Sequence, residues 1–323
     1  MSKPRILITR RWPEGVEREL AERYDVTFNE TDEPMSTDAI RQALMDYDAV
    51  CPTVSDKVDA AALDVKEPRA KILGSYGVGF SHIDLDAARK AGIAVTNTPE
   101  VLSGATADLA ITLMLMAARR AGEGEREVRA GKWTGWRPTH MIGTEVTGGT
   151  FGVLGFGRIG REAAKRAHFG FGMKIIYYDA YPVKPEVAAE VSAESRGSIE
   201  DVLREADVVS LHMPGGKENY HLINAERLKM MKPTAILVNS ARGEVVDGVA
   251  LAAALEAGTI AGAGLDVFEG EPNIVPELLK SEKAVLLPHL GSATATTRHA
   301  MGMRVIENLE AFFAGKEPGD RVA

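Results

Sequence analysis

The chain of 323 residues contains a single cysteine, Cys51. One cysteine permits no intramolecular disulfide and no cysteine-based metal cluster, so a reducing compartment fits the sequence. Long apolar runs are also absent. The most apolar stretch, 109–118, falls far short of the roughly 20 residues that a membrane-spanning helix needs, and the start, MSKPRILITR, lacks the apolar run of a secretory signal. We therefore expect a cytoplasmic protein without a membrane segment.

Basic residues are also fewer than acidic ones, with 38 Lys and Arg against 46 Asp and Glu. The formal net charge of -8 argues against nucleic acid or an anionic membrane as the main partner, although it leaves a small anionic substrate open. With 45% hydrophobic and 26% charged residues, the composition is that of an ordinary globular protein. A chain of this length usually divides into about two domains, because a single hydrophobic core seldom extends so far.

The first hundred residues alternate short strand-like segments with helical ones. This alternation favours a parallel sheet covered by helices on both faces, here without a glycine-rich phosphate loop. A long helix is expected from Thr106 to about Gly122, followed by an irregular loop over 131–149. The expected strands are 5–9, 49–51, 72–74 and 93–96, with helices at 38–46 and 85–91.

A second α/β series begins near residue 150. Six expected strands fill a complete dinucleotide-binding sheet. They are 151–154, 174–178, 208–212, 235–239, 262–265 and 284–287. The residues after Pro288 carry mostly one helix, 294–315, which is too little for a separate domain. We therefore expect the chain to return to its first domain, giving one domain of residues 1–100 and 290–323 and a second of 101–289.

The segment TFGVLGFGRIG, residues 150–160, contains a dinucleotide-binding pattern. Gly155, Gly157 and Gly160 match G-x-G-x-x-G between an apolar strand and a helical stretch. The first glycine allows a tight turn, the second lets backbone amides approach a pyrophosphate, and the third lets the helix pack on the strand. Asp179 ends the next strand, where a carboxylate can bind the ribose hydroxyls and repel a 2′-phosphate. The pattern indicates NAD in preference to NADP.

Three polar segments follow expected strands: VNSARGEVVD, GLDVFEGEP and LLPHLGSAT. They supply Arg242, Asp266, Glu271 and His289 at the sheet edge where ligands of open α/β sheets bind. Reduction of a carbonyl beside a carboxylate needs an anion clamp, a proton donor near neutral pH and a group that keeps the donor charged. Arginine, histidine and a carboxylate provide these functions. Each residue alone could be structural, but together they predict a catalytic group.

The other histidines give no convincing metal-ligand spacing. His-x-x-x-His is absent, so we expect no metal and disfavour a zinc dehydrogenase mechanism. His212, which follows an expected strand in LHMP, is a candidate for the nicotinamide pocket. A methyltransferase stays open at this point, because such enzymes also use a glycine-rich turn after their first strand.

Taken in order, GVLGFGRIG, Asp179, LHMP, VNSARGEVVD, GLDVFEGEP and PHLGSAT resemble the D-isomer-specific 2-hydroxyacid dehydrogenases over nearly the whole chain. The resemblance implies an α/β protein with two doubly wound parallel-sheet domains. On this resemblance, a Rossmann NAD-binding domain would be inserted into a flavodoxin-like substrate domain, with the active site in the cleft. GKWTGWRPTHMIG and HMPGGKENYHLIN look most like the glyoxylate and hydroxypyruvate reductases. The chain departs from common family patterns at Gly149, where a lysine often stands, and at Gly215-Gly216, where Leu-Thr is frequent.

The resemblance also implies roles for individual residues. Arg242 would bind substrate, His289 would be the acid/base and Glu271 would pair with it. Backbone amides of the loop containing Val78 and Gly79 would hold the substrate carboxylate. The implied cofactor contacts are Thr106, Gly155, Gly157, Arg158, Ile159, Gly160, Asp179, His212, Pro214, Ala241, Asp266 and Gly291.

The residues and the resemblance together predict an enzyme that uses NADH to reduce a small 2-oxo acid to the D-2-hydroxy acid. Glyoxylate or hydroxypyruvate is favoured, and His289 gives the proton. The resemblance further suggests a homodimer built partly through residues 101–150. The alternative is an NAD-sensing binding protein like the transcriptional corepressors of the same fold, against which the intact Arg242, Glu271 and His289 weigh.

Overall fold

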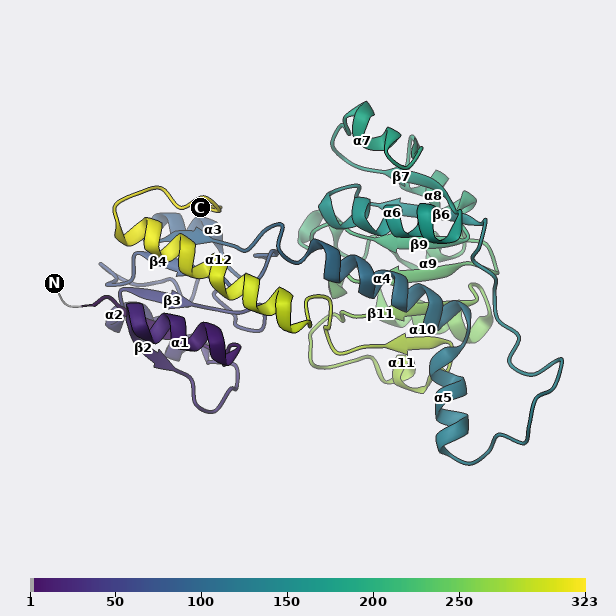
Figure 1. The fold of residues 1–323 in the computed structure, drawn as a ribbon, viewed down its shortest axis with the longest axis horizontal. Helices are drawn as coiled ribbons and strands as arrows, with labels where there is room; N and C mark the ends of the chain where they lie inside the picture. Colours follow the sequence, from purple (N-terminus) through teal and green to yellow (C-terminus); the bar gives the residue numbers. More distant parts are fainter. Residues whose placement is uncertain (1–2) are drawn as a thin grey trace. The chain divides into compact units, whose positions relative to one another are not determined.

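The computed structural model describes residues 3–323, which form two units (Figure 1). The first consists of the residues up to Leu102 together with Ser292–Ala323, and the second is the continuous segment Ser103–Gly291. Each unit is built around its own parallel sheet, of five strands in the first and seven in the second. Each also has apolar clusters of its own on the two faces of the sheet. The expected fold class, α/β with two parallel sheets, is confirmed.

The sheet of the first unit has the strand order β2-β1-β3-β4-β5, which is that of flavodoxin-like sheets. Its strands are β1 (Arg5–Ile8), β2 (Asp25–Phe28), β3 (Ala49–Cys51), β4 (Ile72–Gly74) and β5 (Ala94–Thr96). The four strands that the sequence predicted are present. β2 was missed because it lies at the sheet edge, where its residues alternate between exposed and half-buried and form no apolar run.

Four helices cover the first sheet, and the last of them comes from the end of the chain. They are α1 (Glu14–Arg23), α2 (Thr37–Asp46), α3 (Leu85–Lys90) and α12 (Ala295–Phe313). Thr294 caps α12 by accepting a hydrogen bond from the amide of Thr297. α12 packs against α1 and β4, as Figure 1 shows, and buries Val305 and Leu309 among the apolar side chains of β1 and β3. The returning C-terminal helix therefore completes this core.

The sheet of the second unit has the order β12-β11-β10-β9-β6-β7-β8. From β8 to β11 this is the 3-2-1-4-5-6 order of the Rossmann fold, extended by one strand. The strands are β6 (Thr150–Leu154), β7 (Lys174–Tyr178), β8 (Glu194–Ser195), β9 (Val208–Leu211), β10 (Ile236–Asn239), β11 (Gly262–Leu265) and β12 (Ala284–Leu286). The six predicted strands are present, and the two-residue edge strand β8, which is exposed, was missed.

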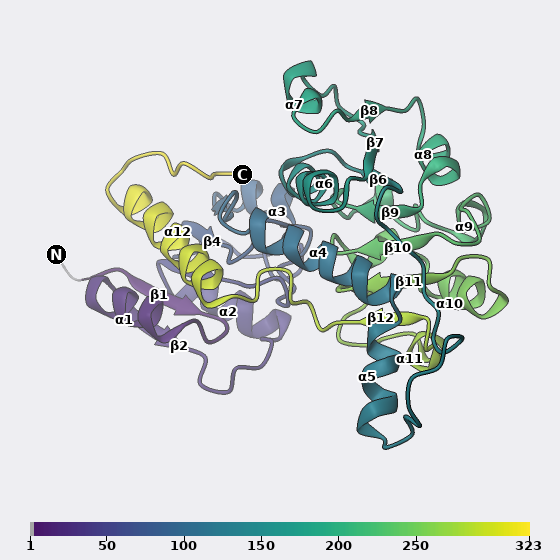
Figure 2. The same cartoon turned by 45° about the vertical axis from the view of Figure 1, so that its right-hand side comes forward.

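Helices pack on both faces of this sheet (Figure 2). They are α4 (Ser103–Ala118), α5 (Ala121–Arg129), α6 (Arg158–Phe171), α7 (Pro185–Ala189), α8 (Ile199–Glu205), α9 (Ala225–Leu228), α10 (Gly248–Ala257) and α11 (Pro276–Lys280), with short 3-10 turns η1 (Lys217–Asn219) and η2 (Gly243–Val245). The helix predicted from Thr106 to about Gly122 corresponds to α4, which ends at Ala118, whereas α5, which begins after a left-handed Arg120 (φ 53°), was not predicted. Among residues 3–323, no helix is long and apolar enough to cross a membrane.

Candidate active site

The glycine turn joins β6 to α6 at the point where the strand order of the second sheet reverses. Gly155 has a φ of 90°, and a Cβ there would lie 2.8 Å from the backbone of His212 and Met213. A Cβ on Gly160 would lie 2.3 Å from the carbonyl oxygen of Gly155, so the helix could not approach the strand. Gly157 caps α6 and borders open space. The turn therefore exposes backbone amides at a helix N-terminus, a site that suits a pyrophosphate.

Arg158 and Ile159, two of the predicted cofactor contacts, lie between Gly157 and Gly160 in the first turn of α6. Arg158 is exposed and Ile159 is half-buried.

Asp179 directly follows β7, as the sequence predicted, and holds the glycine turn in place. Its Oδ2 accepts a hydrogen bond from the amide of Phe156 (2.7 Å), and its Oδ1 accepts one from the amide of Tyr181 (2.9 Å). A carboxylate offers about four acceptor positions, so both oxygens can still bind ribose hydroxyls.

Two buried polar atoms lie at the carboxyl ends of the central strands β9 and β10. Nε2 of His212 is 2.8 Å from the hydroxyl of Ser210, while Nδ1 is buried without a hydrogen-bond partner. The hydroxyl of Ser240 is also buried without a partner. Burial lowers the pKa of His212 to about 4, so the ring is neutral at neutral pH. Buried polar groups normally have partners. These atoms therefore fit a site that receives a polar ligand.

The two remaining predicted contacts on these strand-end loops are less informative. Pro214 is exposed, and its carbonyl accepts a hydrogen bond from the side chain of Asn219. The amide of Ala241 donates to the side chain of Asn239, and its carbonyl accepts from Arg242. Both residues thus shape loops whose backbone lies at the ligand-binding edge of the sheet.

His289 and Glu271 form the pair that the sequence predicted. Nδ1 of His289 is 2.9 Å from Oε2 of Glu271, and the other carboxylate oxygen accepts the amide of Phe268, also at 2.9 Å. Burial alone would raise the pKa of Glu271, but the hydrogen bond and the charge of His289 hold it below its ordinary value. His289 has a left-handed backbone (φ 55°), fixed by its amide, which donates to the carbonyl of Asp266. Glu271 therefore orients the imidazole, and the bond to Asp266 fixes the backbone that carries it.

Asp266 determines the course of the chain after His289. Its buried carboxylate accepts hydrogen bonds from the amides of Leu290 (2.6 Å) and Gly291 (2.8 Å). Burial raises the pKa of Asp266, and the two amides counteract this only in part. The hydroxyl of Thr106, in the first turns of α4, donates to the carbonyl of Gly291 (3.2 Å). The structure thus brings together Thr106, Asp266 and Gly291, three of the residues predicted to contact the cofactor.

Arg242 lies in the loop after β10. Its Nη1 donates a hydrogen bond to the carbonyl of Ala241 (2.7 Å). Burial lowers the pKa of Arg242, although the negative charges of Glu244 and Glu271 act in the opposite direction. A guanidinium stays protonated even so. The next residue, Gly243, has no room for a side chain, because a Cβ would lie 1.9 Å from the carbonyl carbon of Phe268. The loop of Arg242 is therefore in direct backbone contact with the loop that carries Glu271.

Val78 and Gly79 belong to the first unit, in the loop after β4. The carbonyl of Val78 accepts a hydrogen bond from the side chain of Asn97 (2.8 Å), which fixes the loop to the end of β5. The amide of Thr98 donates to the carbonyl of Gly77 in the same loop (2.9 Å). The backbone of this segment is thus anchored through its carbonyl groups.

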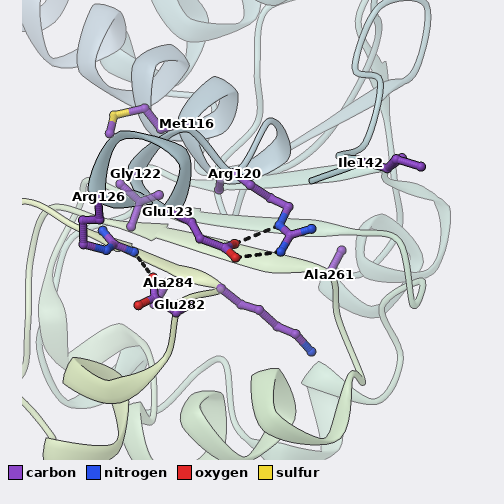
Figure 3. Close-up of a pocket in the computed structure, with 12 residues that line it drawn as sticks. Met116, Arg120, Gly122, Glu123, Arg126, Ile142, Ala261, Glu282 and Ala284 are labelled. Atoms are coloured by element: carbon purple, nitrogen blue, oxygen red, sulfur yellow. Dashed lines mark hydrogen bonds and ion pairs between the residues drawn. The ribbon is translucent and has the colours of Figure 1, made fainter. Parts of the chain in front are cut away.

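A cavity of about 290 Å³ lies in a different part of the second unit, between α5 and the edge strand β12 (Figure 3). Four of its charged residues form pairs, Arg120 with Glu123 (2.8 Å) and Arg126 with Glu282, and the fifth, Lys283, donates to the carbonyl of Leu255. None of the predicted site residues lines it. Within the described part of the chain, residues 3–323, no group of three or more His, Cys, Asp or Glu side chains is arranged to hold a metal ion.

Sequence reasoning missed three contributions to this site. The contact of Asp179 with the glycine turn, the close approach at Gly243 and the pairing of Ser210 with His212 were not predicted. Gly243 was visible as the residue after Arg242, but a glycine in a polar loop gives no hint of which backbone approaches it.

Comparison with known proteins supports a specific family. The sequence model described as D-isomer specific 2-hydroxyacid dehydrogenase, NAD binding domain, matches residues 111–291. The glyoxylate reductase of Thermococcus onnurineus is 47% identical over 320 residues, which cover 98% of this chain and 95% of the relative. The glyoxylate reductase of Thermococcus litoralis is 46% identical over 324 residues, covering 99% and 97%.

Solved structures agree with the sequence relatives. The glyoxylate reductase from Paecilomyes thermophila has a TM-score of 0.87 at 32% identity, covering 100% of this chain and 99% of that one. The NADPH-dependent glyoxylate/hydroxypyruvate reductase from Sinorhizobium meliloti, in complex with NADP and malonate, has a TM-score of 0.88 at 33% identity, covering 100% and 97%.

Proposed function

The chain belongs to the D-isomer specific 2-hydroxyacid dehydrogenase family and is therefore an oxidoreductase, and from this we infer that it reduces a small 2-oxo acid to the D-2-hydroxy acid with NADH. Glyoxylate and hydroxypyruvate are the favoured substrates. The observation that carries the proposal is the contact between His289 and Glu271, which orients an imidazole at the ligand-binding edge of a dinucleotide-type sheet.

The residues of the second unit fit a nicotinamide dinucleotide. Gly155, Gly157 and the N-terminus of α6 would hold the pyrophosphate, and the unpartnered Nδ1 of His212 and hydroxyl of Ser240 offer polar contacts deeper in the site. When bound, the nicotinamide supplies the hydride. The preference for NADH rests on Asp179, whose carboxylate would repel a 2′-phosphate. The relative from Sinorhizobium meliloti is NADPH-dependent, so this preference is a property to measure on this chain.

In the proposed reaction, His289 Nε2 donates a proton to the carbonyl oxygen of the substrate while Nδ1 donates its hydrogen bond to Glu271. The negative charge of Glu271 favours the protonated imidazole, which is the acid form that reduction needs. Arg242 polarises the carbonyl and binds the carboxylate through its planar guanidinium. The amides of Val78 and Gly79 are proposed to bind the same carboxylate.

Replacing His289 tests this assignment. His289→Ala should lower the turnover of glyoxylate by roughly 10² to 10⁴, the usual scale for loss of a general acid, with NADH binding retained in a fluorescence titration. His168→Ala, which changes a histidine in the last turn of α6, is the matched control and should leave turnover intact. Near-normal NADH oxidation by His289→Ala would contradict the assignment. Tight NADH binding by the unmodified protein without turnover of any 2-oxo acid would favour the NAD-sensing alternative.

We further propose a cytoplasmic homodimer. The segment from α5 to β6 exposes four large apolar side chains, Val128 (60%), Trp133 (54%), Trp136 (83%) and Ile142 (68%). Large exposed apolar groups of this kind are typical of association surfaces. Light scattering should give twice the chain mass of 34.7 kDa, and Trp136→Asp should shift the protein towards the monomer. A monomeric mass for the unmodified protein would contradict the proposal.

A further inference from the structure

A histidine and a carboxylate outside the predicted site join two loops of the second unit. Nε2 of His221 is 2.7 Å from Oε2 of Glu269. The other oxygen of Glu269 accepts a hydrogen bond from the hydroxyl of Tyr220 (2.8 Å), whose ring stacks on the imidazole with 4.0 Å between the centroids. The hydrogen bond from His221 holds the pKa of Glu269 below its ordinary value. Asp247 is the second carboxylate facing His221, at 3.9 Å from Nδ1.

The backbone around His221 is bonded to the loop that follows Arg242. The amide of His221 donates to the carbonyl of Glu244 (2.8 Å), and the amide of Ile223 donates to the carbonyl of Val245 (2.9 Å). Ile223 and Val246 form a parallel bridge alongside. A displacement of residues 221–223 would therefore displace the segment directly after Arg242.

Glu269 lies on the loop that carries Glu271. The amide of Phe268, next to Glu269, donates to the carboxylate of Glu271. At the same place the backbone of Phe268 and Glu269 touches Gly243, so the two loops cannot move independently. His221 is thus bonded by its backbone to the loop of Arg242 and by its side chain to the loop of Glu271.

The backbone conformation of His221 indicates that surrounding contacts hold this residue in place. Its φ of 48° lies in the left-handed region, which residues with a side chain adopt rarely and hold only where surrounding contacts fix them. The side chains of His221 and Glu269 are 29% and 42% exposed. Ion pairs as exposed as this contribute little to stability, so their effect is expected in the geometry of the loops.

We propose that Tyr220, His221 and Glu269 form a brace that sets the position of Arg242 relative to the pair Glu271–His289. The three residues are positioning residues and take no part in proton transfer. The proposal rests on the proposed function, because it assigns the brace a role in that reaction. An error of about 1 Å in the placement of reacting groups can cost about 10² in rate, so even a small relaxation of the brace should be measurable.

The variants His221→Gln and Glu269→Gln test the brace. Each should lower kcat with glyoxylate by about 10- to 100-fold and leave the Kd for NADH within about twofold. The double variant should lose little more than either single variant, because partners that act as one unit are not additive.

Glu200→Gln is the matched control. It breaks a comparably exposed ion pair with Arg227 (2.7 Å; side chains 30% and 25% exposed) between α8 and α9 of the same unit. It should change the Tm as much as His221→Gln does, but it should leave kcat unchanged. Equal effects of control and brace variants on kcat, or brace variants that alter only the Tm, would overturn the proposal.

Hydrogen exchange separates failure of the brace from failure of the proposed function. Amides in residues 266–273 should exchange faster in His221→Gln than in the unmodified protein, and at the same rate in Glu200→Gln. If the unmodified protein turns over no 2-oxo acid, the proposed function fails. In that case faster exchange still supports the brace, and unchanged exchange overturns it.

Discussion

Glu271→Gln isolates the charge that the site places beside His289. The glutamine carbonyl can still accept the hydrogen bond from Phe268, so the side chain should keep its position. Its amide group would then point at Nδ1 of His289 and donate a hydrogen bond to it. This favours the neutral imidazole, whereas the carboxylate favours the protonated one.

The size of the effect follows from the contact. The two atoms are 2.9 Å apart and each side chain is 34% exposed, so the effective dielectric constant lies nearer to that of water than to that of a dry interior. With a dielectric constant of about 40 to 80, Coulomb's law gives about 1.5 to 3 kcal/mol, which corresponds to about 10- to 100-fold in rate.

The assay is kcat/KM for glyoxylate at neutral pH. Glu271→Gln should lower it by about 10- to 100-fold, because the neutral glutamine does not stabilise the positive imidazole that donates the proton. Glu277→Gln, which removes an exposed carboxylate at the start of α11, should leave kcat/KM unchanged. A kcat/KM of Glu271→Gln equal to that of the unmodified enzyme would refute the reasoning.

Two further substitutions, and the stability of Glu271→Gln, give three more predictions. Gly243→Ala must force the loop of Phe268 away, and should lower kcat by about 10² in steady-state assays, whereas Gly170→Ala, which meets open space in α6, should not. Asp179→Asn should raise the ratio of kcat/KM for NADPH to that for NADH about tenfold, or about 1.4 kcal/mol; an unchanged ratio would remove Asp179 as the selector. The lowered pKa of Glu271 means that its carboxylate stabilises the fold above about pH 4.5 and that this contribution is lost as pH falls further. Urea unfolding of Glu271→Gln should therefore differ least from that of the unmodified protein in acid.

The central strands and the glycine turn could be predicted because their signals are local. A strand buried on both faces of a parallel sheet is an apolar run in the sequence, as in β6, β9, β10 and β11. The edge strand β12 was predicted as well, because all three of its residues are apolar. β2 and β8 are edge strands with exposed residues and no apolar run, and both were missed. Helix α5 was missed as well, because it contains two glycines and none of its residues is buried, so the sequence shows no apolar face there.

By itself, the sequence determined the fold class, the place of the dinucleotide turn and the residue types of the candidate site, because each depends on neighbours in the chain or on the end of a strand. Only the tertiary structure decided which of those residues meet. Asp179 reaches the glycine turn 23 residues away, and His221 reaches Glu269 across 48 residues. Contacts over such separations depend on how the loops at the sheet edge pack, and Gly243 shows how close that packing is. The reacting groups can thus be identified from the sequence, whereas their geometry depends on the fold.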